Sequence, residues 1–254
     1  MIQARVIPCL LLRGNGLVKT KKFKDAVYLG DPVNAVRIFS DKEADEIVIL
    51  DIDASREGRE PNYELIAEMA GEAFMPVAYG GGVRNLEQIR RLIRSGVEKV
   101  VINTMATEST DTIKAAVDVF GSQAIVGAVD VRKKLFGGYS VMAKSATVDT
   151  RLNLQQHIEN LVQAGVGELF INDVERDGCM VGFDLTLVRS VSQSSVSVVV
   201  CGGAGTLEHL REAVHDGGAS AVAAGSMFVF HGKHRAVLIN YPKAADLEKL
   251  LAKG

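Results

Sequence analysis

One short glycine-rich pattern occurs twice in this chain, about half a chain apart. The first copy, Gly80-Gly81-Gly82, ends an apolar run, and the second, Gly202-Gly203, occupies the same setting. Each copy is followed by a helix-like stretch and another apolar run that ends in a small polar turn, Asn103-Thr104 in the first half and Gly225-Ser226 in the second. Self-similarity at a fixed spacing is typical of a duplicated unit. We therefore expect two similar halves, each built from alternating strands and helices.

The apolar runs as a set predict a closed parallel barrel. Amphipathic helical stretches separate most of the runs, and β-α alternation repeated eight times favours a (β/α)₈ barrel. Prolines and N-cap residues predict helix starts at Asp31-Pro32, Pro61, Asn85 and Thr206. A chain of 254 residues, 47% of them hydrophobic, suits a single barrel domain spanning residues 1–254. The predicted strands are Arg5–Leu12, Glu46–Asp53, Met75–Tyr79, Lys99–Asn103, Ala124–Asp130, Glu168–Asp173, Ser197–Cys201 and Ser220–Gly225.

The two glycine turns are predicted to bind phosphate. Glycines leave backbone N–H groups open to an anion, and a helix that starts just after them adds its positive end. A single glycine pair would more simply be a tight turn, but two copies, each matched by a second polar turn, favour two cradles. Their residues are Gly81, Gly82, Asn103 and Thr104 in the first half and Gly202, Gly203, Gly225 and Ser226 in the second. Two cradles imply a substrate with a phosphate at each end.

Acidic residues follow several of the predicted strands, where barrels of this type carry their active sites. They include Asp51, Asp53, Asp130 and Asp177. Strand ends often carry polar residues for solubility alone, but the coincidence with two cradles on one rim favours a functional set. The long connection 13–30 holds four lysines and is either a mobile basic flap that closes on an anionic substrate or a solvated charged loop. Of its lysines, we expect Lys19 to contact the substrate.

Charge and cysteine content exclude several classes of partner. The net charge of −2, without a basic or acidic tail, gives no indication of nucleic acid or a membrane surface. The chain starts without a signal-peptide pattern and has no apolar run of about 18 residues, so we expect a cytoplasmic protein. Cys9, Cys179 and Cys201 lack metal-type spacing and are expected to be reduced thiols. His231 and His234 stand at helical spacing without further ligands, and we expect no metal.

Several motifs together resemble the HisF family, the cyclase subunit of imidazole glycerol phosphate synthase, over essentially the whole chain. The resemblance implies a (β/α)₈ barrel that accepts ammonia from a glutaminase subunit, HisH. It also implies conversion of a bis-phosphorylated ribulosyl formimino intermediate into imidazole glycerol phosphate and aminoimidazole carboxamide ribotide, without an organic cofactor. The motifs are Ile7-Pro8-Cys9-Leu10, Leu50-Asp51-Ile52, Gly80-Gly81-Gly82-Val83-Arg84, Arg176-Asp177-Gly178 and Gly202-Gly203-Ala204-Gly205.

The resemblance also implies roles for individual residues. Asp130 matches one of two acid–base aspartates, Asp177 an additional carboxylate, and Lys19 the lysine of a closing loop. Ala224 joins Gly203 and Ser226 in the second phosphate site. Four charged residues match a gate for ammonia at the N-terminal mouth of the barrel, where a HisH-like glutaminase would dock, although a plain ring of salt bridges is the simpler interpretation. These four are Arg5, Glu46, Lys99 and Glu168.

Leu11 departs from the family pattern, because it stands where the other acid–base aspartate belongs. Leucine cannot transfer a proton, and general acid–base groups typically contribute about 10²–10⁴-fold in rate. Cyclisation should be severely slowed unless Asp53, where the pattern has threonine, substitutes for the missing acid. Glu175 and Cys179, on either side of Asp177, also depart from the pattern.

Three hypotheses follow from this departure. The chain resembles HisF-like paralogues that supply ammonia for acetamidino modification of surface-polysaccharide sugars, with a sugar-modifying amidotransferase as a further partner. It could instead be an ordinary cyclase, a lyase of histidine biosynthesis in which Asp53 or Asp177 substitutes for the missing acid, or a catalytically silent barrel that only activates its glutaminase.

Overall fold

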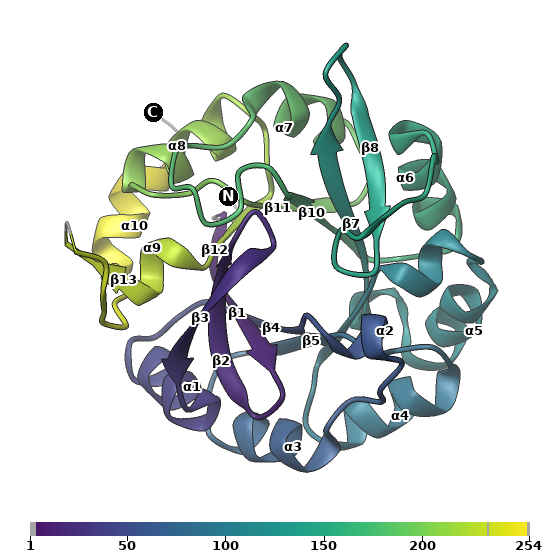
Figure 1. Cartoon of the computed structure of the whole chain (residues 1–254), viewed down its shortest axis with the longest axis horizontal. Helices are drawn as coiled ribbons and strands as arrows, with labels where there is room; N and C mark the ends of the chain where they lie inside the picture. The colour runs from purple at the N-terminus through teal and green to yellow at the C-terminus, as the bar shows by residue number, and fades with distance from the viewer. Residues whose placement is uncertain (1–3, 233, 253–254) are drawn as a thin grey trace.

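Parallel strands form a closed barrel at the centre of the computed structural model, which describes residues 4–232 and 234–252 (Figure 1). Each strand pairs in parallel with the next, and the β10–β7 and β12–β1 pairings complete the closure. The predicted (β/α)₈ barrel is therefore confirmed. The barrel strands are β1 (Arg5–Arg13), β4 (Ile47–Asp51), β5 (Val77–Gly80), β6 (Lys99–Ile102), β7 (Ile125–Lys133), β10 (Glu168–Asp173), β11 (Ser197–Cys201) and β12 (Ala221–Ala224).

Alternation along each strand decides which side chains reach the inside of the barrel. Successive side chains of a strand point to opposite faces. On β1, Cys9 and Leu11 belong to the apolar cluster inside the barrel, whereas Leu10 and Leu12 belong to the cluster between strands and helices. The same rule turns Asp130 of β7 inward, because Ala128, two residues before it, is an inside residue. This alternation of side chains along each strand therefore determines which residues line the C-terminal end of the barrel.

Helices surround the barrel, and side-chain caps mark the starts of several of them. Asp31, Asn85 and Thr206 each accept a hydrogen bond from a first-turn backbone N–H, as predicted. The prediction at Pro61 is displaced, because Asn62 is the N-cap and the helix begins at Tyr63. The longer helices are α1 (Pro32–Asp41), α3 (Tyr63–Gly71), α4 (Leu86–Arg94), α5 (Asp111–Phe120), α6 (Leu154–Gln163), α7 (Leu185–Val191), α8 (Leu207–His215) and α10 (Ala244–Leu251). Shorter turns are α2 (Ala54–Glu57), α9 (Ser226–Val229), η1 (Thr104–Thr107) and η2 (Ser122–Ala124).

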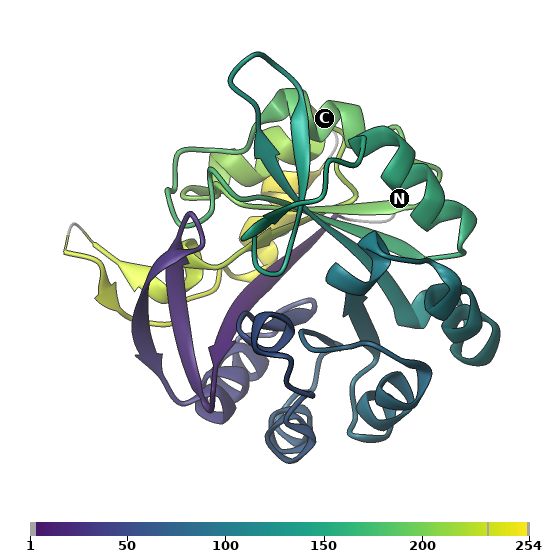
Figure 2. The ribbon, with the colours of Figure 1, turned by 45° about the vertical axis from the view of Figure 1, so that its right-hand side comes forward.

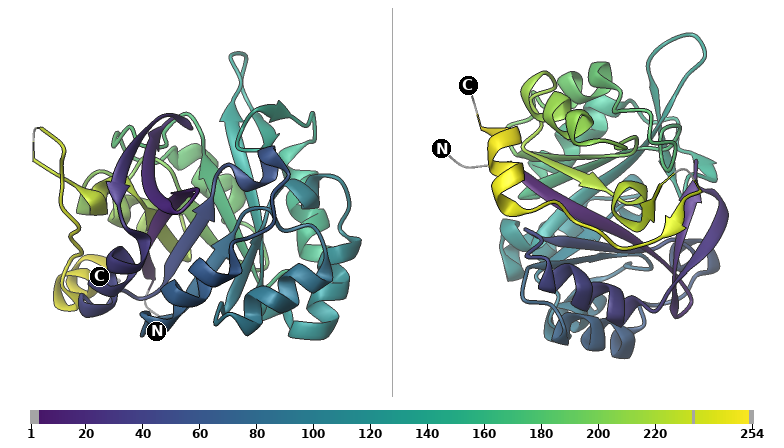
Figure 3. Two further views of the ribbon diagram at one scale, coloured as in Figure 1. Left: turned by 60° about the horizontal axis from the view of Figure 1, so that its bottom comes forward. Right: turned by 90° about the vertical axis from the view of Figure 1, so that its left-hand side faces the viewer.

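Two hairpins rise from the end of the barrel where the strands finish (Figure 3, left). The first is β2 (Gly16–Lys21) with β3 (Lys24–Gly30), and β2 pairs antiparallel with β1. The second joins β7 to β8 (Tyr139–Ala143), followed by the short β9 (Val148–Asp149), and its tip extends far beyond the barrel (Figure 2). The connection 13–30 is thus an ordered hairpin rather than an irregular loop.

A third hairpin lies at the side of the barrel. It is formed by β13 (Phe230–His231) and β14 (Ala236–Val237). His231 is in a strand and His234 in the turn, so the inferred helical spacing of this pair is wrong. Across the described ranges, the structure contains no helix with the length and apolarity that a membrane span requires.

The two halves of the chain repeat the same backbone geometry. Gly81 and Gly202 follow corresponding strands, and a Cβ on either would lie 2.5 Å from a backbone oxygen, that of Asp51 and Asp173 respectively. Both glycines have positive φ, +119° and +94°, which favours glycine. The turns after the preceding strands also match, since Gly58 and Gly178 share a φ of 70°. These equivalences support the predicted duplication.

Candidate active site

One pocket at the C-terminal end of the barrel collects the predicted catalytic and phosphate-binding residues. It spans about 1290 Å³, including the part at its mouth that is open solvent. The inward-facing ends of the strands form its floor, and both glycine turns form its rim. The predicted residues that line it are Leu11, Lys19, Asp53, Asp130, Asp177, Gly81, Gly82, Asn103, Thr104, Gly202, Gly203, Ala224, Gly225 and Ser226.

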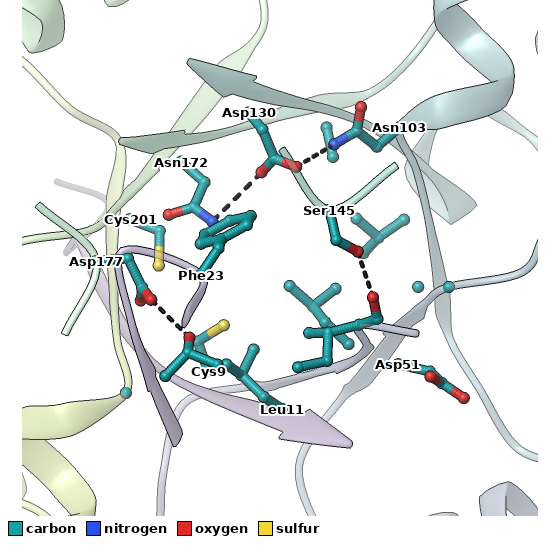
Figure 4. Close-up of a pocket in the computed structure, with 18 of the residues that line it drawn as sticks. Cys9, Leu11, Phe23, Asp51, Asn103, Asp130, Ser145, Asn172, Asp177 and Cys201 are labelled. Atoms are coloured by element: carbon teal, nitrogen blue, oxygen red, sulfur yellow. Dashed lines mark hydrogen bonds between the residues drawn. The ribbon is translucent and has the colours of Figure 1, made fainter. Parts of the chain in front are cut away.

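Asp130 lies between two asparagine amides (Figure 4). The Nδ2 of Asn103 donates to its Oδ2 at 2.7 Å, and the Nδ2 of Asn172 donates to its Oδ1 at 3.3 Å. Burial raises the pKa of Asp130 to about 7, although both amide bonds oppose the shift by favouring the ionised form. A carboxyl group with this pKa exchanges protons readily near neutral pH. Asp130 is therefore suited to general acid–base chemistry.

Asp177 is held in a different way, by the β2–β3 hairpin. Its side chain accepts from the buried Nζ of Lys19 at 2.6 Å and from the hydroxyl of Thr20 at 2.8 Å. The backbone N–H of Lys22 also donates to the carbonyl oxygen of Asp177 at 2.8 Å. The hairpin is thus latched onto the turn that follows β10. Lys19 is buried at the pocket, whereas Lys21, Lys22 and Lys24 are exposed, so only one of the four lysines lines the site.

Leu11 lies across the pocket from Asp130 in Figure 4, within the apolar inside cluster of the barrel. Asp53 does not offer a free acid in its place. Its Oδ2 lies 2.9 Å from Nε of Arg13, and its Oδ1 accepts from Nη2 of Arg56 at 2.7 Å. Both of its carboxyl oxygens are therefore already engaged by guanidinium groups. This geometry argues against Asp53 as a substitute catalyst.

The two glycine turns close tightly against neighbouring backbone. A Cβ on Gly82 would lie 2.5 Å from the carbonyl oxygen of Arg59, and one on Gly203 would lie 2.1 Å from that of Gly182. Each turn is followed by a capped helix, α4 or α8. The hydroxyl of Ser226 is buried and has no hydrogen-bond partner among the described residues. A bound anion would satisfy this hydroxyl.

The four charged residues at the opposite mouth form a closed ring of alternating sign. Arg5 donates to both Glu46 and Glu168, and Nζ of Lys99 lies 2.7 Å from Glu46 and 3.0 Å from Glu168. Burial alone would lower the pKa of Arg5, but the bonds to Glu168 and Glu46 raise it above its usual value. Each acid therefore contacts both bases. The ring separates the apolar inside of the barrel from the N-terminal face.

Sequence reasoning did not assign every residue of the pocket. Asn172, near the end of β10, lies opposite Asp130 in the β10–β7 register. Its place could have been found from parity, because it follows the inside residue Phe170 by two. Phe23 from the β2–β3 hairpin and Ser145 after β8 also line the pocket, and Ser145 donates to the carbonyl oxygen of Ile52. Neither hairpin contact had a sequence signal, since both depend on tertiary folding.

The cysteines and histidines form no evident ligand set. No group of three or more His, Cys, Asp or Glu side chains in the part of the chain that the structure describes is arranged to hold a metal ion. Cys9 and Cys201 are free thiols that line the pocket floor. A hydrogen bond with Cys9, together with burial, raises the pKa of Cys201. The expectation that the protein uses no metal stays a prediction.

The fold and the pocket define a class: a (β/α)₈ barrel whose polar groups converge at the C-terminal face, where barrels of this class carry their active sites. A family model described as "Histidine biosynthesis protein" matches residues 5–235. The chain is 53% identical over 251 residues to a Pseudomonas aeruginosa protein named "Putative imidazole glycerol phosphate synthase subunit hisF2", covering 98% of this chain and 99% of that one.

Two further relatives agree with this match. A Leptospira borgpetersenii protein, named in the same way as subunit HisF, is 44% identical over 252 residues, which is 98% of this chain and 99% of the relative. The "Imidazole glycerol phosphate synthase subunit HisF" of Caulobacter vibrioides is 39% identical over 232 residues, 91% of this chain and 89% of the relative. The chain therefore belongs to the HisF family, as its motifs predicted.

Proposed function

We propose that this chain is the ammonia-accepting subunit of a glutaminase-coupled enzyme, in a HisF paralogue whose acceptor is not the histidine precursor. The observation that carries the proposal is Leu11. It places an apolar side chain across the pocket from Asp130, where the family pattern requires a second proton-transfer group, and the nearby Asp53 is paired with Arg13 and Arg56. The pocket therefore retains one acid–base group and lacks the other.

An ammonia path from the N-terminal mouth of the barrel, through its inside, to the pocket is consistent with the geometry. A HisH-like glutaminase would dock at the N-terminal face, beside the ring of Arg5, Glu46, Lys99 and Glu168. Ammonia released there would enter the inside of the barrel, which is lined by apolar and small residues and so favours a neutral molecule over an ion. Inside residues between the ring and the pocket include Ile7, Val48, Ala78, Val126, Val199, Ala221 and Ala223.

At the pocket, each polar group has a separate task in this proposal. The glycine turns with Asn103, Thr104 and Ser226 would hold a phosphorylated small molecule, and Lys19 on the hairpin would cover it and exclude water. Asp130 would take a proton from the attacking ammonia, or return one to the product, at near-neutral pH. The chemistry that fits is addition of ammonia to an electrophilic carbon of the bound molecule: as the C–N bond forms, Asp130 takes one proton from the nitrogen and returns it to the atom that receives the displaced electron pair.

The particular role that we favour is supply of ammonia for acetamidino modification of surface-polysaccharide sugars, together with a sugar-modifying amidotransferase. The runner-up is a genuine cyclase that makes imidazole glycerol phosphate and aminoimidazole carboxamide ribotide. The names of the relatives support it, because they describe synthase subunits. A barrel that only activates its glutaminase is the third candidate.

The test is to purify the chain with a cognate glutaminase and to supply glutamine and the ribulosyl formimino substrate. We expect glutamine hydrolysis with little or no imidazole glycerol phosphate. Leu11→Asp should raise the cyclase rate by roughly 10²–10⁴-fold if only the second acid is missing. Leu11→Asn is the matched control, because it is equally polar but cannot transfer a proton. Rapid cyclisation by the unaltered chain would refute the proposal and establish the runner-up.

A further inference from the structure

Asp130 differs from every other carboxyl group that lines the pocket. Asp51 pairs with Arg59, Asp53 with Arg13 and Arg56, and Asp177 with Lys19, in each case with a cation. Among the described residues, Asp130 has only neutral partners, the amides of Asn103 and Asn172. The two amides bond to different oxygens of the carboxylate. Together they fix its rotation and leave no cation to hold it ionised.

Asn172 makes this contact at the expense of its other polar atom. Its side chain is buried, and its Oδ1 has no hydrogen-bond partner among the described residues. An ionised carboxylate only accepts hydrogen bonds, so the amide nitrogen must face Asp130 and the oxygen must face away. A buried polar atom without a partner is unfavourable, and leucine would fill a similar volume without this cost. The hydrogen bond to Asp130 is the only one that the amide group of Asn172 makes among the described residues.

The positions of the two amides follow from the strand order. Asn103 directly follows β6 and Asn172 lies on β10, the two strands that flank β7 in the barrel. Each reaches Asp130 from one side, as Figure 4 shows. On β8, the residue opposite Asp130 is Met142, which carries no charge. The charged groups nearby are Asp177 with its partner Lys19, and Arg132, which is engaged with Glu175.

We propose that Asn172 is a positioning residue that, with Asn103, clamps the Asp130 carboxyl group in one orientation and keeps it available as the single proton-transfer group of the pocket. The inference rests on the role proposed above for Asp130. It goes beyond that role, because it assigns a positioning task to Asn172, a residue on a neighbouring strand. Without these two hydrogen bonds, the Asp130 carboxyl group would be free to rotate, and its protonated form would be favoured over its ionised form.

The test measures the ionisation of Asp130 directly, by carbon-13 NMR of aspartate-labelled protein, with its signal assigned through Asp130→Asn. In the unaltered chain we expect titration near pH 7. Asn172→Leu removes one donor to the ionised form and should raise the titration midpoint by about one pH unit or more. Asn103→Leu should do the same from the other side. Ile171→Val, on the same strand but facing the helices, is the control and should leave the midpoint unchanged.

A second measurement separates positioning from packing. The pH profile of ammonia transfer should move to higher pH in Asn172→Leu by the same amount as the NMR midpoint, and should not move in Ile171→Val. If Asn172→Leu does not fold, Asn172→Ala removes the same donor without adding an apolar group. An unchanged Asp130 midpoint, or an equal shift in Ile171→Val, would overturn the inference. If no ammonia transfer is found, the proposed function fails, while the NMR midpoints still decide whether the clamp exists.

Discussion

Replacing Asp130 with asparagine should make the stability of the protein less dependent on pH. Burial raises the pKa of Asp130 from 3.8 to about 7, so the folded chain keeps this proton over a range in which the unfolded chain has released it. The resulting stabilisation is fully present below about pH 4 and is lost as the pH rises through about 7. Since one pKa unit corresponds to about 1.4 kcal/mol, the full effect is about 4 kcal/mol.

Asparagine at position 130 imitates the protonated carboxyl at every pH. Asn103 and Asn172 can turn their amides to match it, because the Oδ1 of each has no hydrogen-bond partner among the described residues. The assay is urea unfolding of both proteins between about pH 4 and about pH 8. The free energy of unfolding of the unaltered chain should fall relative to that of Asp130→Asn by up to about 4 kcal/mol over this range.

A matched control and a clear negative outcome complete this test. Asp118 is exposed and has no ion pair among the described residues, so Asp118→Asn should keep the pH dependence of the unaltered chain. If the curves for Asp130→Asn and the unaltered chain run parallel, burial does not raise the pKa of Asp130. The assignment of Asp130 as a neutral-pH proton carrier would then lose its physical basis.

Three further outcomes are expected. Gly203→Ala would place a Cβ 2.1 Å from a backbone oxygen at a φ of +117°, so calorimetry should show weaker binding of inorganic phosphate, whereas Gly71→Ala, with open space around it, should bind normally. Gly178→Ala would place a Cβ 2.2 Å from the carbonyl oxygen of Thr20 and displace the β2–β3 hairpin, so trypsin should cut the hairpin faster. An unchanged rate of cleavage would contradict the attachment of the hairpin to the turn that follows β10. Lys99→Met should reduce glutamine-dependent transfer more than transfer from added ammonium if the charged ring is a gate, and an equal loss in both would favour a structural ring.

The fold was predictable because its signals are local and repeated. Apolar runs and helix caps are properties of neighbouring residues, and the glycine turns at Gly81 and Gly202 need a backbone conformation that favours glycine. The extension of β7 from the predicted end at Asp130 to Lys133 was missed, because pairing with β8 depends on a partner strand.

The site was predictable only in part. Its residues were brought to one pocket as expected, since strand ends meet at one rim of a parallel barrel. Their electrostatic states were not predictable: Asp53 and Asp130 look alike in sequence, yet one is held between two guanidinium groups and the other between two amides. Partners that lie on other strands decide this difference, and their identity emerges only in the folded chain.

The contact between Lys19 and Asp177 has a consequence for how the protein is made. The two residues are 158 positions apart, with the hairpin in the first half and its anchor in the second. During synthesis on the ribosome, the hairpin emerges long before the acid that secures it. The β2–β3 hairpin of the nascent chain therefore lacks its anchor, and the contact between Lys19 and Asp177 can form only after most of the polypeptide has left the ribosome.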